Sequence, residues 1–361
     1  MRWESWATAG RGRRVAVAII VVASAAVAAC SSSNDAAPTT TTAPTADQQL
    51  ARTKLSSMPA FRDAPWADDL KAEQDRLDAS DRVETAYGRF SLPEFQGEYT
   101  NVSNSERRTL ESSCSGCPER VVWVVGASAA FGLGQRDDNT VASNLVRAGD
   151  AAGLHLTVRN LAVPGTTFVE EVDGVRRHLA VDPVKPDVVV FYDGFNDVLS
   201  SYGYALVNDG ATMDRISFDG DYMQTFLGMN PPPDLPDDVV QRVAEHVATS
   251  YRARRQEIAD ELASQGIATA FFFQPDAFVS DIQLQSTMRA LNPSMAMLAG
   301  QPDLGQLLSQ TSDRLTPDVH SLRPTMAAVT VPMFADPAHL NEAGAALMAN
   351  EVFGVVRTDL Q

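Results

Sequence analysis

Val121-Val-Trp-Val-Val-Gly126-Ala-Ser128-Ala-Ala-Phe-Gly132 is the stretch that decides the fold. An apolar, β-branched run of strand length breaks at Gly126, and a serine follows two residues later. A buried strand that stops there presents the next side chains at the carboxyl end of its sheet, where open α/β sheets place their sites. We therefore take Ser128 as a candidate nucleophile. The alternative for this stretch alone is a strand-to-helix loop in which the serine caps backbone amides.

Strand and helix patterns alternate along the rest of the chain. Near-continuous apolar strands separated by helices indicate a parallel sheet covered on both faces. After the first strand we expect further strands at residues 156–160, 187–192, 267–274 and 327–334, and helices at residues 166–180, 237–265 and 341–357.

Composition and charge limit the classes of function. The chain has 361 residues, 44 % of them apolar, which suffices for one large or two small globular domains. The formal net charge is −17. Residues 1–29 carry four arginines and one glutamate, so the remainder has a charge of about −20. A surface this acidic argues against nucleic acid or a bare anionic membrane as the partner.

The amino-terminal residues have the pattern of an export signal. Arg11-Gly-Arg-Arg14 precedes residues 15–29, which are apolar except for Ser24 and too few to span a bilayer comfortably. Val27-Ala-Ala-Cys30 resembles the lipobox of bacterial lipoproteins. This resemblance implies cleavage of a signal peptide (1–29) before Cys30, acylation of Cys30 and residence on the outer face of the bacterial cell membrane. The alternative is an ordinary secretory signal with a chance cysteine.

Three segments follow the signal peptide. Residues 30–47 are rich in Ser, Thr and Pro and read as a disordered tether. Residues 48–118 are mixed and charged, and the helical spacing of Trp66, Leu70 and Leu77 predicts an amino-terminal helical extension without a chemical signature. Residues 119–361 form the main domain, and residues 198–335 look longer than a minimal domain needs, which suggests lid or specificity insertions.

Two cysteines precede the first core strand, in Cys114-Ser-Gly-Cys117. A redox C-x-x-C motif starts a helix after a strand, whereas here a strand follows. Outside the cytoplasm we therefore expect a tight structural disulfide. A metal site would need two more ligands at suitable spacing, and none stands nearby, so we expect no metal site.

Phe334-Ala-Asp336-Pro-Ala-His339 supplies partners for the serine. A serine hydroxyl needs a base within hydrogen-bond reach, and that base needs an acceptor that fixes its tautomer. An aspartate three residues before a histidine, on a turn ahead of a helix, can contact it locally. The other four histidines lack such an arrangement, so we assign them structural or surface roles.

An acyl-transfer site also needs donors aimed at the developing oxyanion. Three candidates follow successive strands: the amide of Ser128, the amide of Gly165 and the side chain of Asn196. Glycine lets the backbone approach a substrate closely, and an asparagine amide donates without titrating. The alternatives are that Gly165 only turns the chain and that Asn196 only caps a loop.

Together these residues resemble the SGNH (GDSL-type) hydrolase family. Its four blocks occur in order over residues 121–357, and the resemblance does not cover the first 118 residues: Gly126-Ala-Ser128, Asn160-Leu-Ala-Val-Pro-Gly165, Gly194-Phe-Asn196-Asp197 and Asp336-Pro-Ala-His339. Two positions depart from the family pattern. Ala127 replaces an aspartate, which puts the local loop geometry in doubt, and Ala162 replaces a common glycine.

The resemblance implies a fold and an activity. The fold is a three-layer α/β/α sandwich with a five-stranded parallel sheet, like flavodoxin. The catalytic residues are Ser128, Asp336 and His339, with an oxyanion hole of Ser128, Gly165 and Asn196, and no cofactor is required. An α/β-hydrolase is rejected because it expects a G-x-S-x-G elbow, and residue 130 is alanine here.

The sequence therefore predicts a membrane-anchored extracytoplasmic serine esterase. Its substrates would be small-molecule, lipid or carbohydrate carboxylic esters, and the expected location suggests O-acyl groups of cell-envelope sugars or lipids. Two other functions stay open: an acyltransferase that uses the same triad, and a non-catalytic lipoprotein that binds carbohydrate or lipid.

Overall fold

The computed structural model describes residues 54–85, 88–217, 221–229, 232–287 and 297–361. The expected signal peptide and tether lie outside these ranges, and so does Cys30. Within the described residues, no helix is both long enough and apolar enough to cross a membrane.

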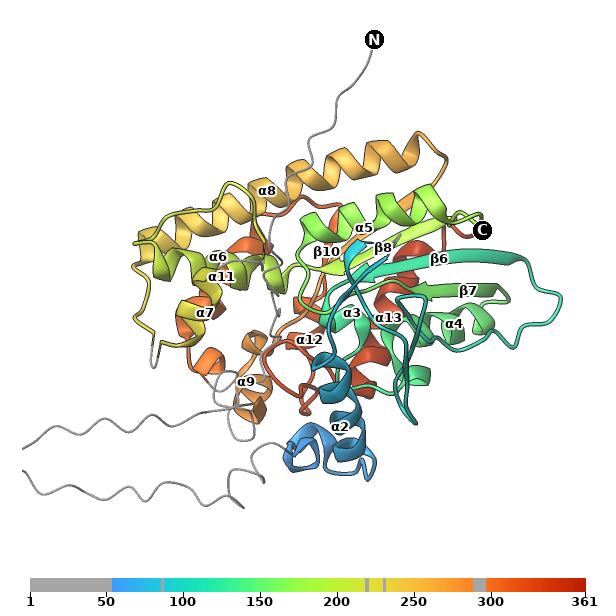
Figure 1. The fold of residues 1–361 in the computed structure, drawn as a ribbon, viewed down its shortest axis with the longest axis horizontal. Helices are drawn as coiled ribbons and strands as arrows, with labels where there is room; N and C mark the ends of the chain where they lie inside the picture. Colours follow the sequence, from blue (N-terminus) through green and yellow to red (C-terminus); the bar gives the residue numbers. More distant parts are fainter. Residues whose placement is uncertain (1–53, 86–87, 218–220, 230–231, 288–296) are drawn as a thin grey trace, which may run out of the picture.

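A sheet of eight strands forms the centre of the fold (Figure 1). Its five parallel strands are, in spatial order, β10 (Val319–Ser321), β9 (Ala268–Phe273), β8 (Val188–Asp193), β6 (Glu119–Gly126) and β7 (His155–Asn160). Three antiparallel strands continue the sheet beyond β7: β5 (Glu106–Arg107), β4 (Asn101–Ser103) and β3 (Phe95–Gln96). The expected five-stranded parallel sheet is present, and the antiparallel strands extend it.

Strand β6 lies between β7 and β8 and pairs with both in parallel. Val124 lies opposite Asn160 on one side, and Gly126 lies opposite Tyr192 on the other. The five parallel strands follow the flavodoxin-like order, which reverses direction at the first strand. The carboxyl ends of β6, β7 and β8 therefore lie at the same edge, next to this reversal.

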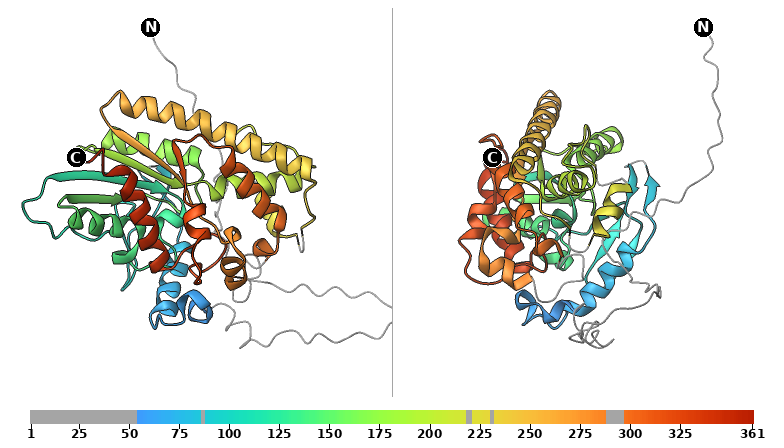
Figure 2. Two further views of the ribbon diagram at one scale, coloured as in Figure 1. Left: turned by 180° about the vertical axis from the view of Figure 1, so that it is seen from behind. Right: turned by 90° about the vertical axis from the view of Figure 1, so that its left-hand side faces the viewer.

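Alternating side chains of β6 enter two separate apolar cores. Trp123 and Val125 pack in the core with α5 (Phe168–Val181), α6 (Phe195–Val207), α8 (Asp237–Ala263) and α11 (Pro302–Asp313). Val122 and Val124 pack in the core with α4 (Val141–Ala151) and α13 (Glu342–Val356). Figure 2 shows these two groups of helices on opposite sides of the sheet. The arrangement is the expected three-layer sandwich, and each fully buried valine contributes about 1.5–3 kcal/mol.

Most of the expected elements agree with the structure to within two residues at each end. The remaining helices are α2 (Ala67–Asp78), α3 (Ser128–Phe131), α7 (Asp221–Leu227), α9 (Asp281–Thr287) and α12 (Arg323–Ala327), with 3₁₀ turns η1 (Leu55–Ser57), η2 (Pro59–Phe61), η3 (Asp137–Asn139) and η4 (Ala277–Val279). Two strands, β1 (Val83–Thr85) and β2 (Gly88–Ser91), form a separate antiparallel pair.

The expected fifth strand at residues 327–334 was wrong. The fifth parallel strand is β10, which comes earlier in the chain and pairs with β9. Pro332 interrupts the apolar run and cannot donate a ladder hydrogen bond. The carbonyl groups of Val329 and Val331 accept hydrogen bonds from the side chain of Gln283 instead. This segment is therefore an irregular loop, and it leads into the Asp336–His339 turn.

The amino-terminal extension is not only helical. Helix α2 is present where the spacing of Leu70 and Leu77 predicts it, and both side chains are buried. The same extension also supplies β1 to β5, of which β3 to β5 join the central sheet. These strands have two to four residues each, too few to show a period-two pattern. Glu73 of α2 orders the region by accepting hydrogen bonds from the amides of residues 98–100.

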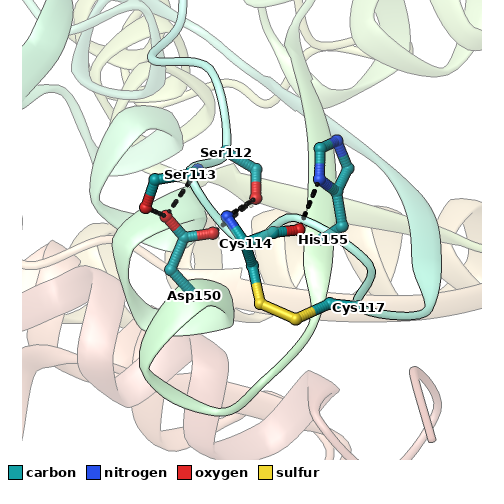
Figure 3. Close-up of a disulfide and its surroundings, with 6 residues drawn as sticks. All are labelled: Ser112, Ser113, Cys114, Cys117, Asp150 and His155. Carbon is teal, nitrogen blue, oxygen red and sulfur yellow. Dashed lines mark hydrogen bonds between the residues drawn. A yellow bond between two sulfur atoms is a disulfide. The ribbon is translucent and has the colours of Figure 1, made fainter.

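Cys114 and Cys117 form a disulfide, as expected (Figure 3). Asp150 of α4 accepts hydrogen bonds from Ser112 and Ser113 beside it. His155 Nδ1 lies 3.1 Å from the carbonyl oxygen of Cys114. These contacts hold the loop that precedes β6 against α4 and β7, as a structural disulfide would.

Replacing both cysteines by alanine should lower the free energy of unfolding by about 2 kcal/mol, because the disulfide closes a loop of only four residues. The ester hydrolysis that the sequence predicts, measured on the same protein, should stay at the wild-type rate. Denaturant unfolding of the wild type under reducing conditions is the matched control. A large loss of hydrolysis in the folded double variant would contradict the structural assignment.

Candidate active site

The residues predicted to form the site are the ones that reach the surface from buried segments. Between residues 122 and 132 every residue is buried except Ser128, and between residues 188 and 203 every residue is buried except Asn196. Gly165 and His339 are likewise half-buried, each between buried neighbours. Polar groups that emerge from an apolar core in this way are held by the core, so their positions are fixed by packing.

The turn between β6 and Ser128 needs the glycine at residue 126. Gly126 has φ +153°, and a Cβ there would lie 2.2 Å from the carbonyl oxygen of Tyr192 on β8. Only a residue without a side chain fits so close to the neighbouring strand. Ser128 then begins the one-turn helix α3, with Ala127 as its N-cap residue. Ala127, which stands where the SGNH pattern has an aspartate, thus lies in a turn that still delivers Ser128 to the surface.

The structure brings Ser128, His339 and Asp336 into one hydrogen-bonded chain. His339 Nε2 lies 2.7 Å from Ser128 Oγ, and His339 Nδ1 lies 2.6 Å from Asp336 Oδ2. Asp336 Oδ1 also accepts hydrogen bonds from the backbone amides of Ala338 and His339, at 2.9 and 3.0 Å. The carboxylate accepts the Nδ1 proton, so we assign the tautomer in which Nε2 accepts the serine hydroxyl proton.

Backbone and side-chain hydrogen bonds fix the turn that carries Asp336 and His339. The amide of Ala335 donates to the carbonyl oxygen of His339 at 2.7 Å, which closes the turn. Gln274, the residue after β9, donates through Nε2 to the carbonyl oxygen of Ala338 at 3.3 Å. The amide of Ala277 donates to the carbonyl oxygen of Pro337 at 2.8 Å. The turn is thus attached to the end of a parallel strand although it does not follow one.

The expected oxyanion donors stand after β6, β7 and β8. Gly165 has φ +81°, in the left-handed region that favours glycine. Asn196, in the first turn of α6, donates one Nδ2 proton to the carbonyl oxygen of Thr166 at 2.8 Å. This hydrogen bond connects Asn196 to the loop of Gly165 and leaves its second amide proton for a substrate. The amides of Ser128 and Gly165 donate to no group among the described residues.

Asp193 and Asp197, on either side of Asn196 in the chain, and Glu171 have buried carboxyl groups. The sequence did not point to a role for them. Asp193 ends β8 and accepts a hydrogen bond from Tyr251 at 2.8 Å, and Asp197 accepts one from the amide of Phe168. Burial raises the pKa of Asp193 to about 7, and burial together with the neighbouring carboxyl groups raises the pKa of Asp197 and of Glu171 well above their ordinary values.

Glu171 and Asp193 form a pair of buried carboxyl groups that influence each other. Glu171 Oε2 and Asp193 Oδ2 are buried without a hydrogen-bond partner among the described residues, and each carboxyl group contributes to the pKa shift of the other. Two neighbouring carboxyl groups that are buried in this way do not both ionise, so one of them keeps its proton. Asp193 directly precedes the Gly194-Phe-Asn196-Asp197 block and Asp197 ends it, but Glu171 lies in a helical pattern without any local signal.

No family model matches the sequence, and no curated protein matches it. Similar solved structures include the lipase/acylhydrolase from Enterococcus faecalis, which is 19 % identical over 65 % of this chain and 96 % of its own, with a TM-score of 0.36. The acetyl xylan esterase AlAXEase is 17 % identical over 65 % of this chain and 99 % of its own, with a TM-score of 0.36. The psychrotrophic esterase EstA from Pseudoalteromonas sp. is 11 % identical over 67 % of this chain and 98 % of its own, with a TM-score of 0.32.

The retained proton predicts a pH dependence of stability. Between the ordinary pKa of an aspartate, 3.8, and the value of about 7 for Asp193, the folded protein holds a proton that the unfolded chain releases. The contribution of this cluster to the free energy of unfolding should therefore fall as the pH rises from about 4 to about 7. Glu171→Gln supplies a donor that does not titrate, so its loss of stability over this range should be smaller.

Urea unfolding of the wild type and of Glu171→Gln at several pH values between 4 and 8 measures this difference. Asp81→Asn, which removes an exposed carboxylate, is the control and should keep the wild-type dependence. Parallel stability curves for the wild type and Glu171→Gln would show that the pair does not retain a proton.

Proposed function

We propose that this protein is a serine hydrolase that cleaves carboxylic esters through an acyl-Ser128 intermediate. The observation that carries the proposal is the continuous chain of hydrogen bonds from Ser128 Oγ through the His339 ring to Asp336, at 2.7 and 2.6 Å. A serine activated by a base that is itself oriented by a carboxylate defines this class of chemistry.

The first half of the reaction forms the acyl-enzyme. Ser128 Oγ attacks the ester carbonyl carbon, and its proton passes to His339 Nε2. Asp336 stabilises the imidazolium that results. When the tetrahedral intermediate collapses, the bond to the alcohol oxygen breaks, and His339 returns the proton to the departing alcohol.

The second half of the reaction releases the acid. A water molecule gives a proton to His339 Nε2 and attacks the acyl carbon. The bond to Ser128 Oγ then breaks, and the serine recovers its proton. In both halves the negative charge on the carbonyl oxygen faces the amides of Ser128 and Gly165 and the side chain of Asn196, and one such donor contributes about 10²–10³ in rate.

The proposed substrates are O-acyl groups of cell-envelope sugars or lipids, and the proposed location is the outer face of a bacterial membrane. The support is the arrangement of a basic segment, an apolar segment and Cys30 at the amino terminus. Multiple acyl chains on Cys30 would anchor the protein firmly, since each buried methylene contributes about 0.8 kcal/mol. Residues 30–47 would form the tether that follows the anchor.

Ser128→Ala should lower kcat/KM on p-nitrophenyl esters by roughly 10⁴–10⁶-fold, because the nucleophile is removed. Its thermal stability should stay close to that of the wild type, since a half-buried hydroxyl is lost. A fluorophosphonate probe should label the wild type and the Ser264→Ala control, whose changed residue is exposed, but not Ser128→Ala. Near-normal hydrolysis by Ser128→Ala would contradict the mechanism, and transfer to an added alcohol in excess of hydrolysis would identify an acyltransferase.

The full chain, expressed in a bacterium and fed an alkyne analogue of palmitate, should incorporate the label at Cys30. Cys30→Ala should lose the label completely, because cleavage and acylation both require that residue. The variant that lacks Cys114 and Cys117 should keep the label, which controls for thiol labelling elsewhere. An unlabelled wild type, or label retained in Cys30→Ala, would refute the anchor.

A further inference from the structure

The amino-terminal segment of residues 54–110 packs against the loop that follows Ser128. We take this loop as residues 131–136. It begins with the last residue of α3 and leads to η3. Figure 1 shows α2 of the segment below α3, and β5 of the segment joins the edge of the sheet at β7. Side chains from both α2 and β5 reach the backbone of the loop.

Arg107 of β5 closes the carboxyl end of α3. It donates through one terminal nitrogen to the carbonyl oxygens of Phe131 and Gly132, at 2.8 and 2.6 Å, and through the other to that of Gln135, at 2.5 Å. Its Nε pairs with Asp137 at 3.0 Å, and its side chain is fully buried. A buried guanidinium is costly unless it is paired and fully hydrogen-bonded, so these contacts leave it little freedom.

Gln74 of α2 contacts the same loop as Arg107 of β5 does. Its Oε1 accepts a hydrogen bond from the amide of Gly134 at 2.9 Å. Its Nε2 lies 3.4 Å from the carbonyl oxygens of Gly132 and Gln135. Arg107 and Gln74 thus share two acceptors, and together they bind the loop on both sides of Leu133.

The loop also holds the segment that carries His339. Gln135 Nε2 donates to the carbonyl oxygen of Leu340 at 3.0 Å. From the next residue, Asn341 Nδ2 donates to the carbonyl oxygen of Ala60, in the amino-terminal segment. The segment of residues 54–110 is therefore connected to both sides of the Ser128–His339 contact.

We propose that Arg107 and Gln74 are positioning residues, which hold Ser128 and His339 at reacting distance through the loop of residues 131–136. This inference rests on the proposed function. Helix α3 has a single turn, too short to be stable without external contacts. A displacement of about 1 Å at a reacting group costs about 10²-fold in rate, so the far end of α3 has to be fixed.

Gln74→Met tests the proposal, because methionine has a similar length and forms none of these hydrogen bonds. We expect kcat on a short p-nitrophenyl ester to fall about tenfold with an unchanged KM, and fluorophosphonate labelling of Ser128 to slow in proportion. Asp68→Ala is the matched control: it removes two hydrogen bonds from α2 to Ser56 and none to the loop. Its kcat should equal that of the wild type.

Arg107→Lys gives a second measurement. Lysine keeps the charge opposite Asp137 but loses most of the donors to the loop, so kcat should fall further than in Gln74→Met. If Arg107→Lys does not fold, Gln74→Met decides alone. A wild-type kcat in folded Gln74→Met, or an equal loss in Asp68→Ala, would overturn the proposal.

Hydrogen exchange separates this inference from the proposed function. In Gln74→Met, amide exchange in residues 128–136 and 333–341 should be faster than in the wild type, with no such change in Asp68→Ala. If the wild type were neither labelled nor able to hydrolyse esters, the proposed function would fail. The exchange data would still test whether Gln74 holds the loop of residues 131–136 and the segment that carries His339. Unchanged amide exchange in Gln74→Met would overturn the proposal that Gln74 is a positioning residue.

Discussion

Parallel pairing of β6 with both β7 and β8 is the constraint on which the rest of the structure depends. The three strands run in the same direction, so the loops that follow them leave from one edge. A shift in register would move the apolar side chains of β6 out of their two cores, which fixes the pairing. Ser128, Gly165 and Asn196 therefore take their positions from core packing. His339 takes its position from hydrogen bonds between its turn and the residues that follow β9, Gln274 and Ala277.

The parts of the site that the sequence predicts are those with local signals. Gly126 ends an apolar run, and Asp336 stands three residues before His339, so both features can be recognised from the sequence alone. The fifth strand was misplaced because residues 327–334 look apolar, whereas β10 has only three residues and includes a histidine and a serine. The strands of the extension depend on Glu73, whose partners lie about 25 residues away. The burial of Arg107 had no signal either, since charged residues are usually exposed.

The buried carboxyl groups matter for the charge near the proposed oxyanion site. Asp193 and Asp197 flank Asn196 in the sequence, and Glu171 lies beside Asp193. Three ionised carboxylates at this place would oppose a negative charge on a substrate oxygen, because Coulomb interactions are strong where water is excluded. Retention of a proton by Glu171 or Asp193 reduces this repulsion. The two oxygens Glu171 Oε2 and Asp193 Oδ2 are buried without a hydrogen-bond partner among the described residues, which also favours a protonated group at this place.

Arg107 and Gln74 bind main-chain atoms of the loop rather than its side chains. The backbone needs glycine at residues 132 and 134, where φ is +93° and +83°, but the anchoring hydrogen bonds do not involve the side chain of Leu133. A change of the side chain at residue 133 therefore leaves the hydrogen bonds from Arg107 and Gln74 in place. Relatives of this chain can therefore vary residue 133 while the main chain of Ser128 stays in place, since the amide of residue 133 still donates to the carbonyl oxygen of Ser128.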